Sequence, residues 1–138
     1  MNMTAKSLIK RHEGFNSRPY KCTAGKLTIG WGRNIEDNGI SVQEAEFLLD
    51  NDILRCQLDL YKYRWYLDQP YDVQIALLDM CFNMGINKLI CFKKMIKALE
   101  DKDYTVAAME ALDSKWAKQV GDRAKTIAVM IREANHAK

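Results

Sequence analysis

Residues that break helices gather in one stretch near the start of the chain, and they limit what this region can fold into. Pro19, Gly25 and Gly30 interrupt any helix there. The segment Lys26–Trp31 alternates loosely between polar and apolar residues, as strand residues do. We therefore predict a small antiparallel sheet over residues 18–36.

The residues before this stretch carry the signals of a short helix. Thr4 is a residue type that caps helices, and it predicts a helix over residues 4–13. The spacing of the apolar residues predicts that Leu8 and Ile9 face inward.

Every segment after residue 40 is helical in character. Ser41-Val-Gln-Glu44 is a capping box, in which the Ser and Glu side chains each accept from the backbone N–H of the other. It opens a helix toward residue 51, and residues 52–63 form its continuation or a second helix. Pro70 suits the first position of the next helix, and Gly85 suits its end. Further helices are predicted near residues 88–100, 103–112 and 121–135, with a short one around residues 114–118.

These elements define the fold class as α+β, mostly α, with a small N-terminal antiparallel sheet lobe and a larger helical lobe joined by a long helix. A chain of 138 residues is long enough for one domain with a real core. We expect a single domain, residues 1–138, with two lobes: approximately residues 14–52, and residues 1–13 together with 65–138. Ligand sites often form at such junctions, so a cleft is expected between the lobes.

Several function classes are disfavoured by composition. No apolar run approaches the roughly 18 residues that a membrane span needs. The first ten residues contain no long apolar segment, so we expect no signal peptide and synthesis in the cytoplasm. The net charge of +3 arises entirely in residues 93–138, which hold 10 basic and 7 acidic side chains. This mild excess suits an anionic polymer but is too weak to indicate nucleic acid.

The four cysteines divide into two kinds. None lies at metal-ligand spacing and no CxxC occurs, so neither a metal site nor another cofactor is expected. Cys56, Cys81 and Cys91 lie in largely apolar helical segments and are expected to be small buried hydrophobic residues. Cys22 differs because it lies in a polar segment near glycine.

Three residues in the first third of the chain suit cleavage of a glycosidic bond. That reaction needs a general acid on the leaving oxygen and a second group at the anomeric carbon. Glu13 ends a helix-like run and suits the acid, Cys22 follows nine positions later, and Thr28 follows six after that. Taken singly, Glu13 is more often a solvated surface charge, and Thr28 is explained by its preference for strands.

A second group of candidates ends the helix before Gly85. Phe82 and Asn83 have the side chains that line a sugar subsite, although Phe82 is equally a core residue. Trp116 is expected to be a core anchor, and Arg123 an ion-pair partner.

The spacing of Glu13, Cys22 and Thr28 resembles the signature of phage-type lysozymes, glycoside hydrolase family 24: Glu, eight residues, Asp or Cys, five residues, Thr. The resemblance continues in order through residues 41–46, 76–85 and 114–117 to residues 123–124. It implies a two-lobed α+β fold whose cleft binds the glycan strand of peptidoglycan. It also implies hydrolysis of the β-1,4 bond between N-acetylmuramic acid and N-acetylglucosamine. Glu13 would be the acid, Thr28 would orient water or the second group, and Phe82 and Asn83 would line the cleft.

Cys22 occupies the position that Asp often holds in this family. A thiol has an ordinary pKa of about 8.5 and is mostly neutral at pH 7 unless its surroundings favour the thiolate. Lys21, Arg18 and Lys26 are close in sequence and are expected to do so. The thiolate would attack the anomeric carbon with retention, or act as a base for water with inversion.

Two other functions stay open at this point. With a single carboxylate, Glu13 would act as acid and then base in a lytic transglycosylase that releases 1,6-anhydromuramic ends. A catalytically retired module would only bind glycan, and the retained Glu13 argues against it. The family resemblance further implies a monomer that stays in the host cytoplasm until a holin-type partner gives it access to the wall.

Overall fold

The structure is a computed structural model that describes residues 3–136, and these residues divide into two compact units after Leu48. The architecture is α+β and mostly helical, with one small antiparallel sheet, which confirms the predicted fold class. None of the helices within residues 3–136 is long and apolar enough to cross a membrane. The predicted association of residues 1–13 with residues 65–138, and the cleft between the lobes, stay predictions.

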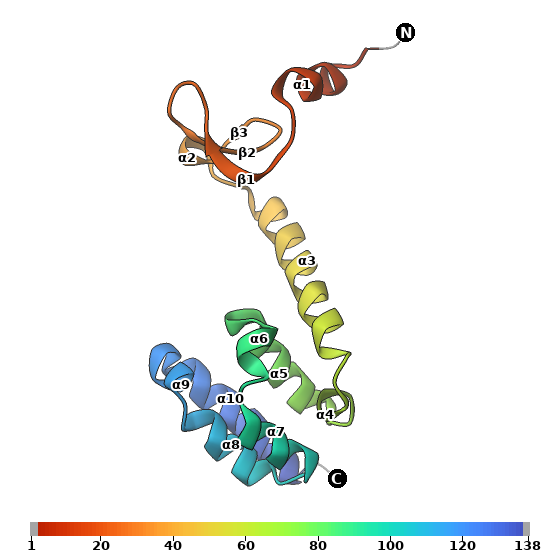
Figure 1. Cartoon of the computed structure of the whole chain (residues 1–138), viewed down its shortest axis with the longest axis vertical. Coiled ribbons are helices and arrows are strands. Elements are labelled where there is room, and N and C mark those ends of the chain that lie inside the picture. Colours follow the sequence, from red (N-terminus) through yellow and green to blue (C-terminus); the bar gives the residue numbers. More distant parts are fainter. Residues whose placement is uncertain (1–2, 137–138) are drawn as a thin grey trace. The chain divides into compact units, whose positions relative to one another are not determined.

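The first unit contains the sheet (Figure 1). Its elements are α1 (Ala5–Glu13), β1 (Asn16–Lys21), β2 (Leu27–Gly30), β3 (Arg33–Asn34), α2 (Ile35–Asn38) and the start of α3 (Val42–Leu60). The strands pair in the order β1-β2-β3, all antiparallel. Thr28 lies in the middle strand, opposite Tyr20 on one side and Asn34 on the other. The sheet lies where the glycine and proline pattern predicts it, and it begins two residues earlier.

Helix α1 begins as predicted but does not bury its apolar side chains. The Ser7 backbone N–H donates to Thr4 Oγ1 at 3.1 Å, and the Thr4 N–H donates to Ser7 Oγ at 3.1 Å. Leu8 and Ile9 are 39% and 53% exposed, so they are not buried against the sheet. Thr28 is the single buried residue among residues 3–48, so this unit has no apolar core of its own. The inward orientation of Leu8 and Ile9 depends on the predicted association of residues 1–13 with residues 65–138 and stays a prediction.

The capping box predicted at Ser41 and Glu44 is present at the start of α3. Ser41 N–H donates to Glu44 Oε1 at 2.8 Å, and Glu44 N–H donates to Ser41 Oγ at 3.1 Å. The helix runs without a break from Val42 to Leu60, so the segment beyond residue 51 is its continuation.

The second unit is built from helices. They are α4 (Arg64–Leu67), α5 (Tyr71–Met84), α6 (Ile86–Leu89), α7 (Lys93–Glu100), α8 (Tyr104–Leu112), α9 (Lys115–Val120), α10 (Asp122–Arg132) and the 3-10 turn η1 (Glu133–His136). In Figure 1, α8 and α10 lie side by side, and α7 and α5 pack against them.

Gly85 ends α5 as predicted, and its N–H donates to Cys81 O at 2.8 Å. Pro70 is the cap of α5 and not its first residue.

All buried apolar side chains among the described residues lie in the second unit, from Leu60 onward. Along α5, Val73, Leu77 and Cys81 are buried and Leu78 is partly buried, at the spacing of one helix face. Gln69 is the buried polar side chain of this core. Its amide donates to Trp65 O and Leu99 O at 2.8 and 3.1 Å, and it accepts from the Tyr104 hydroxyl at 2.8 Å.

Candidate active site

Glu13 is the last residue of α1, and its carboxylate lies against Gly32. A Cβ atom added to Gly32 would come within 2.6 Å of Glu13 Oε2 and 2.8 Å of its Cδ. Gly32 also has φ +77, a conformation that favours glycine. The positive φ favours glycine at this position, and any larger residue there would displace the Glu13 carboxylate. Gly32 therefore forms the surface on which the candidate acid rests, and the spacing of the motif did not identify it.

Cys22 and Thr28 are brought together by the turn between β1 and β2. Cys22 N–H donates to Lys26 O at 3.0 Å, and Gly25 N–H donates to Cys22 O at 2.8 Å, which closes the turn. Thr28 is 3% exposed and donates its hydroxyl to the same Lys26 carbonyl at 2.8 Å. The half-buried thiol therefore lies in a turn whose backbone is fixed on both sides.

Hydrogen bonding lowers the pKa of the Cys22 thiol below its ordinary value. The largest cause is the backbone of Lys26, followed by the backbone of Ala24, and the Thr28 side chain adds to them. The neighbouring cations predicted for this role do not act on the thiol. Lys26 Nζ instead lies 3.6 Å from Glu36 and 3.3 Å from Asp37.

The residue after Gly32 ties the sheet to the start of α3. Arg33 donates to Glu44 Oε1 and to Gly39 O, both at 3.0 Å. The hydrogen bond from Arg33, followed by that from the Ser41 backbone, lowers the pKa of Glu44 to about 2. This ion pair keeps β3, the strand that follows Gly32, in contact with α3.

Phe82 and Asn83 lie in the second unit, on the last turn of α5. Phe82 is exposed and lines a hollow of about 310 Å³ together with Asp79 and Arg123. Asn83 Oδ1 accepts from Trp116 Nε1 at 2.7 Å, so its carbonyl already has a structural partner. Their predicted role in binding substrate stays a prediction.

The predictions that Trp116 is a core anchor and that Arg123 is an ion-pair partner are confirmed. Trp116 is 8% exposed and belongs to the apolar core. Arg123 Nε donates to Asp79 Oδ1 at 2.8 Å, which is an ion pair within the second unit.

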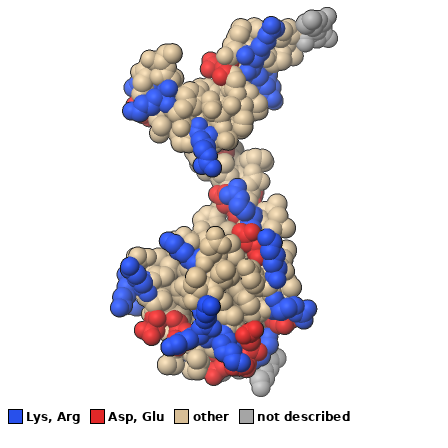
Figure 2. All heavy atoms as spheres, viewed as in Figure 1, with Lys and Arg blue, Asp and Glu red and all other residues tan. Residues whose placement is uncertain are grey.

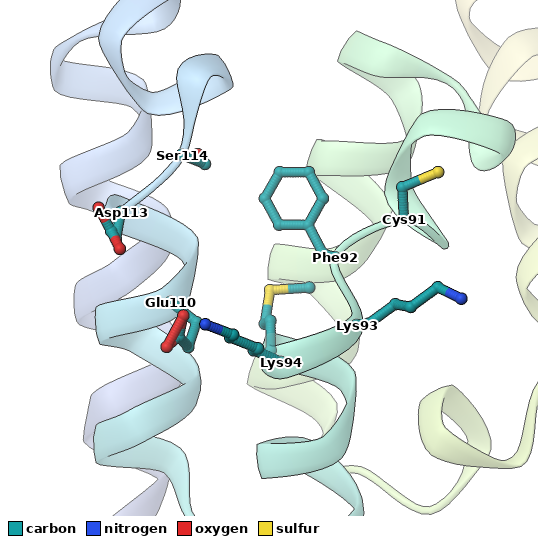
Figure 3. Close-up of a pocket in the computed structure, with 8 residues that line it drawn as sticks. Cys91, Phe92, Lys93, Lys94, Glu110, Asp113 and Ser114 are labelled. Carbon is teal, nitrogen blue, oxygen red and sulfur yellow. The ribbon is translucent and has the colours of Figure 1, made fainter.

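A groove of about 410 Å³ lies between α7 and α8, and Phe92 and Met95 are among the residues that line it. Figure 3 shows Lys94 and Glu110 extending toward each other from the two helices. Figure 2 shows basic and acidic side chains interspersed on this unit. The basic excess of the last third is therefore spread among acidic neighbours, as in the Lys97–Asp101 pair at 3.1 Å.

The remaining cysteines only partly match their prediction. Cys81 is buried and Cys56 half-buried, but Cys91 is exposed and its thiol donates to Asn87 O at 3.3 Å. Cys91 falls in the short connection between α6 and α7, outside either helix, which explains the error. Burial, followed by the nearby Cys56, raises the pKa of Cys81 to about 12. Among residues 3–136, no group of three His, Cys, Asp or Glu side chains is placed to hold a metal ion.

Comparison with known proteins agrees with this arrangement. The family model described as phage lysozyme matches residues 10–135. An endolysin of Acyrthosiphon pisum secondary endosymbiont phage 1 is 34% identical over 80% of this chain and 75% of its own length. A protein named probable T4-type lysozyme 1, from Dictyostelium discoideum, is 26% identical over 95% of both chains. The pre-baseplate central spike protein Gp5 of enterobacteria phage T4 is 26% identical over 97% of this chain, which spans 28% of that protein's length.

One unit carries a small sheet and a carboxylate at the end of its first helix, and the other unit is helical, which is consistent with the lysozyme-like class of glycoside hydrolases. The chain belongs to the phage lysozyme family. Membership in this family makes it a glycoside hydrolase with a peptidoglycan-lytic role of the lysozyme type.

Proposed function

We propose that the protein is a muramidase that hydrolyses the β-1,4 bond between N-acetylmuramic acid and N-acetylglucosamine in the glycan strand. In this proposal, Glu13 donates a proton to the leaving oxygen. Cys22 is the second group at the anomeric carbon, and Thr28 holds that sulfur or a water molecule. Phe82 and Asn83 contact the sugars.

The observation that carries the proposal is the setting of the three motif residues in the first unit. The Glu13 carboxylate rests on Gly32, two residues after β2 ends, while Thr28 lies within β2. Thr28 hydrogen bonds to the turn that holds Cys22 and helps to lower the pKa of its thiol. A lowered pKa raises the thiolate fraction at neutral pH, and the thiolate is the reactive form of cysteine.

Two courses are open to the thiolate, and each gives a different anomer. If it attacks the anomeric carbon while Glu13 protonates the leaving oxygen, a thioglycosyl intermediate forms. Water then hydrolyses this intermediate with Glu13 as base, and the anomeric configuration is retained. If the thiolate removes a proton from water, the water attacks directly and the configuration is inverted. Proton NMR of freshly released muramic ends separates these courses.

The bond that is cleaved is tested by mass spectrometry of digested peptidoglycan. We expect reducing N-acetylmuramic ends. A digest dominated by 1,6-anhydromuramic ends would contradict hydrolysis and would indicate the transglycosylase reaction, in which Glu13 acts alone.

The role of the sulfur is tested by a matched pair of cysteine variants. We expect Cys22→Ser to lose most wall lysis and Cys56→Ser to retain it, because Cys56 packs against the core of the second unit. Cys22→Asp should remain a working enzyme, since a carboxylate supplies the same nucleophile or base. Equal lysis by Cys22→Ser and Cys56→Ser would show that Cys22 takes no part in the cleavage.

Within the same proposal, the substrate is reached from the host cytoplasm with the help of a holin-type membrane-permeabilising partner, and the enzyme works as a monomer. A host that expresses the protein with and without such a partner tests this. Lysis should require the partner.

A further inference from the structure

Helix α1 carries the proposed acid, yet few contacts fix it to the sheet. None of its residues is buried. Among the described residues 3–136, no hydrogen bond or ion pair that involves a residue of α1 reaches the sheet. In Figure 1 most of α1 extends away from the strands, and the chain returns to them at β1. The end of α1 therefore depends on a small number of side-chain contacts.

Trp31 makes those contacts. Lys10 Nζ lies 4.2 Å from the centre of the Trp31 ring, a cation–π contact. The Phe15 ring lies 4.9 Å from the same ring, tilted by 48°. Lys10 precedes Glu13 by three residues and Phe15 follows it by two, so Trp31 holds the chain on both sides of the acid. The next residue, Gly32, is the one against which the Glu13 carboxylate rests.

The backbone between these contacts cannot fix the carboxylate by itself. Gly14 separates Glu13 from β1 with φ +69 and no heavy atom within 4 Å of an added Cβ atom. Glycine gives the chain a wide choice of conformations at this junction. Without the Trp31 ring, the end of α1 would be free to pivot at Gly14, and the carboxylate would leave Gly32.

We infer that Trp31 is a positioning residue for the glycosidase reaction, which holds Glu13 on Gly32 by binding Lys10 and Phe15; this inference rests on the proposed role of Glu13 as the acid. A displacement of about 1 Å in a catalytic group lowers the rate of the chemical step by up to roughly a hundredfold. The acid acts in the transition state, so its displacement lowers kcat while KM changes little. A sugar contact would instead raise KM.

The test compares Trp31→Ala with Trp31→Phe on soluble glycan fragments of peptidoglycan. We expect Trp31→Ala to lower kcat by roughly tenfold to a hundredfold with KM within about threefold of the wild type. Trp31→Phe keeps an aromatic ring for Lys10 and Phe15 and should restore most of kcat. Tyr71→Ala, which truncates an exposed aromatic residue of the second unit, should leave both constants unchanged.

Other outcomes overturn the inference. A raised KM with unchanged kcat in Trp31→Ala would show that Trp31 contacts the substrate. If neither kcat nor KM changes, Trp31 has no role in the site. If circular dichroism shows that Trp31→Ala does not fold, Lys10→Ala and Phe15→Ala decide instead. A wild-type kcat in both of these variants overturns the inference. Glu13→Gln is measured alongside: if it retains activity the proposed acid is wrong, whereas an inactive Glu13→Gln with a normal Trp31→Ala rejects the positioning role alone.

Discussion

Each of the two units is stabilised internally by a different kind of contact. The second unit has a continuous apolar core that includes Leu77, Leu99 and Ile131, all fully buried. The first unit buries only Thr28 among residues 3–48 and relies on hydrogen bonds, the Arg33–Glu44 ion pair and the Trp31 ring. The proposed catalytic groups lie in the unit without a core. If these groups carry out the cleavage, stability and chemistry depend mainly on different parts of the chain, and a substitution should affect one more than the other.

The two units should differ most in how much free energy of unfolding they lose when an apolar side chain is truncated. Leu77→Ala removes a fully buried side chain and should lower the free energy of unfolding of the second unit by about 2–5 kcal/mol. Leu27→Ala removes a partly exposed side chain of the sheet and should cost less than about 1 kcal/mol.

Urea unfolding measures this contrast because the tryptophans report on separate units. Trp65 and Trp116 are buried in the second unit, while Trp31 lies in the first. The Leu77→Ala transition should move to lower urea in the signal of the buried pair. Equal losses in both variants would contradict the division of roles.

A smaller effect is expected from the ion pair of the first unit, and it depends on pH. The folded pKa of Glu44 is about 2, below its ordinary value of 4.5. Since the folded pKa is depressed, its stabilisation is fully present above about pH 4.5 and is lost as the pH falls through 2. The difference in melting temperature between the wild type and Glu44→Gln should therefore shrink from pH 6 to pH 2.

Glu46→Gln is the matched control on the same helix, because Glu46 is exposed and is not part of this ion pair. Its melting temperature should follow that of the wild type at each pH. A constant difference between the wild type and Glu44→Gln over this range would show that the ion pair does not stabilise the first unit.

The elements that could be predicted from sequence are those fixed by local chemistry. The caps at Thr4 and Ser41 depend on residues three apart, so the starts of α1 and α3 were predicted correctly. Glycine and proline placed the sheet and the end of α5 for the same reason.

What the sequence did not predict depends on contacts between segments. The lowered pKa of Cys22 was predicted in direction but assigned to nearby cations, whereas the turn supplies backbone hydrogen bonds. The roles proposed for Gly32 and Trp31 depend on the contacts of these residues with Glu13 and Lys10 at the end of α1.

The most direct test of the account is lysis by Glu13→Gln. Outer-membrane-permeabilised bacterial cells are mixed with equal amounts of wild-type or variant protein, and the fall in turbidity is followed. Loss of a general acid costs roughly 10²–10⁴ in rate, so the variant should leave the suspension turbid while its melting temperature stays near that of the wild type. Clearing of the cells by Glu13→Gln at close to the wild-type rate would contradict the central claim that this carboxylate carries out the cleavage.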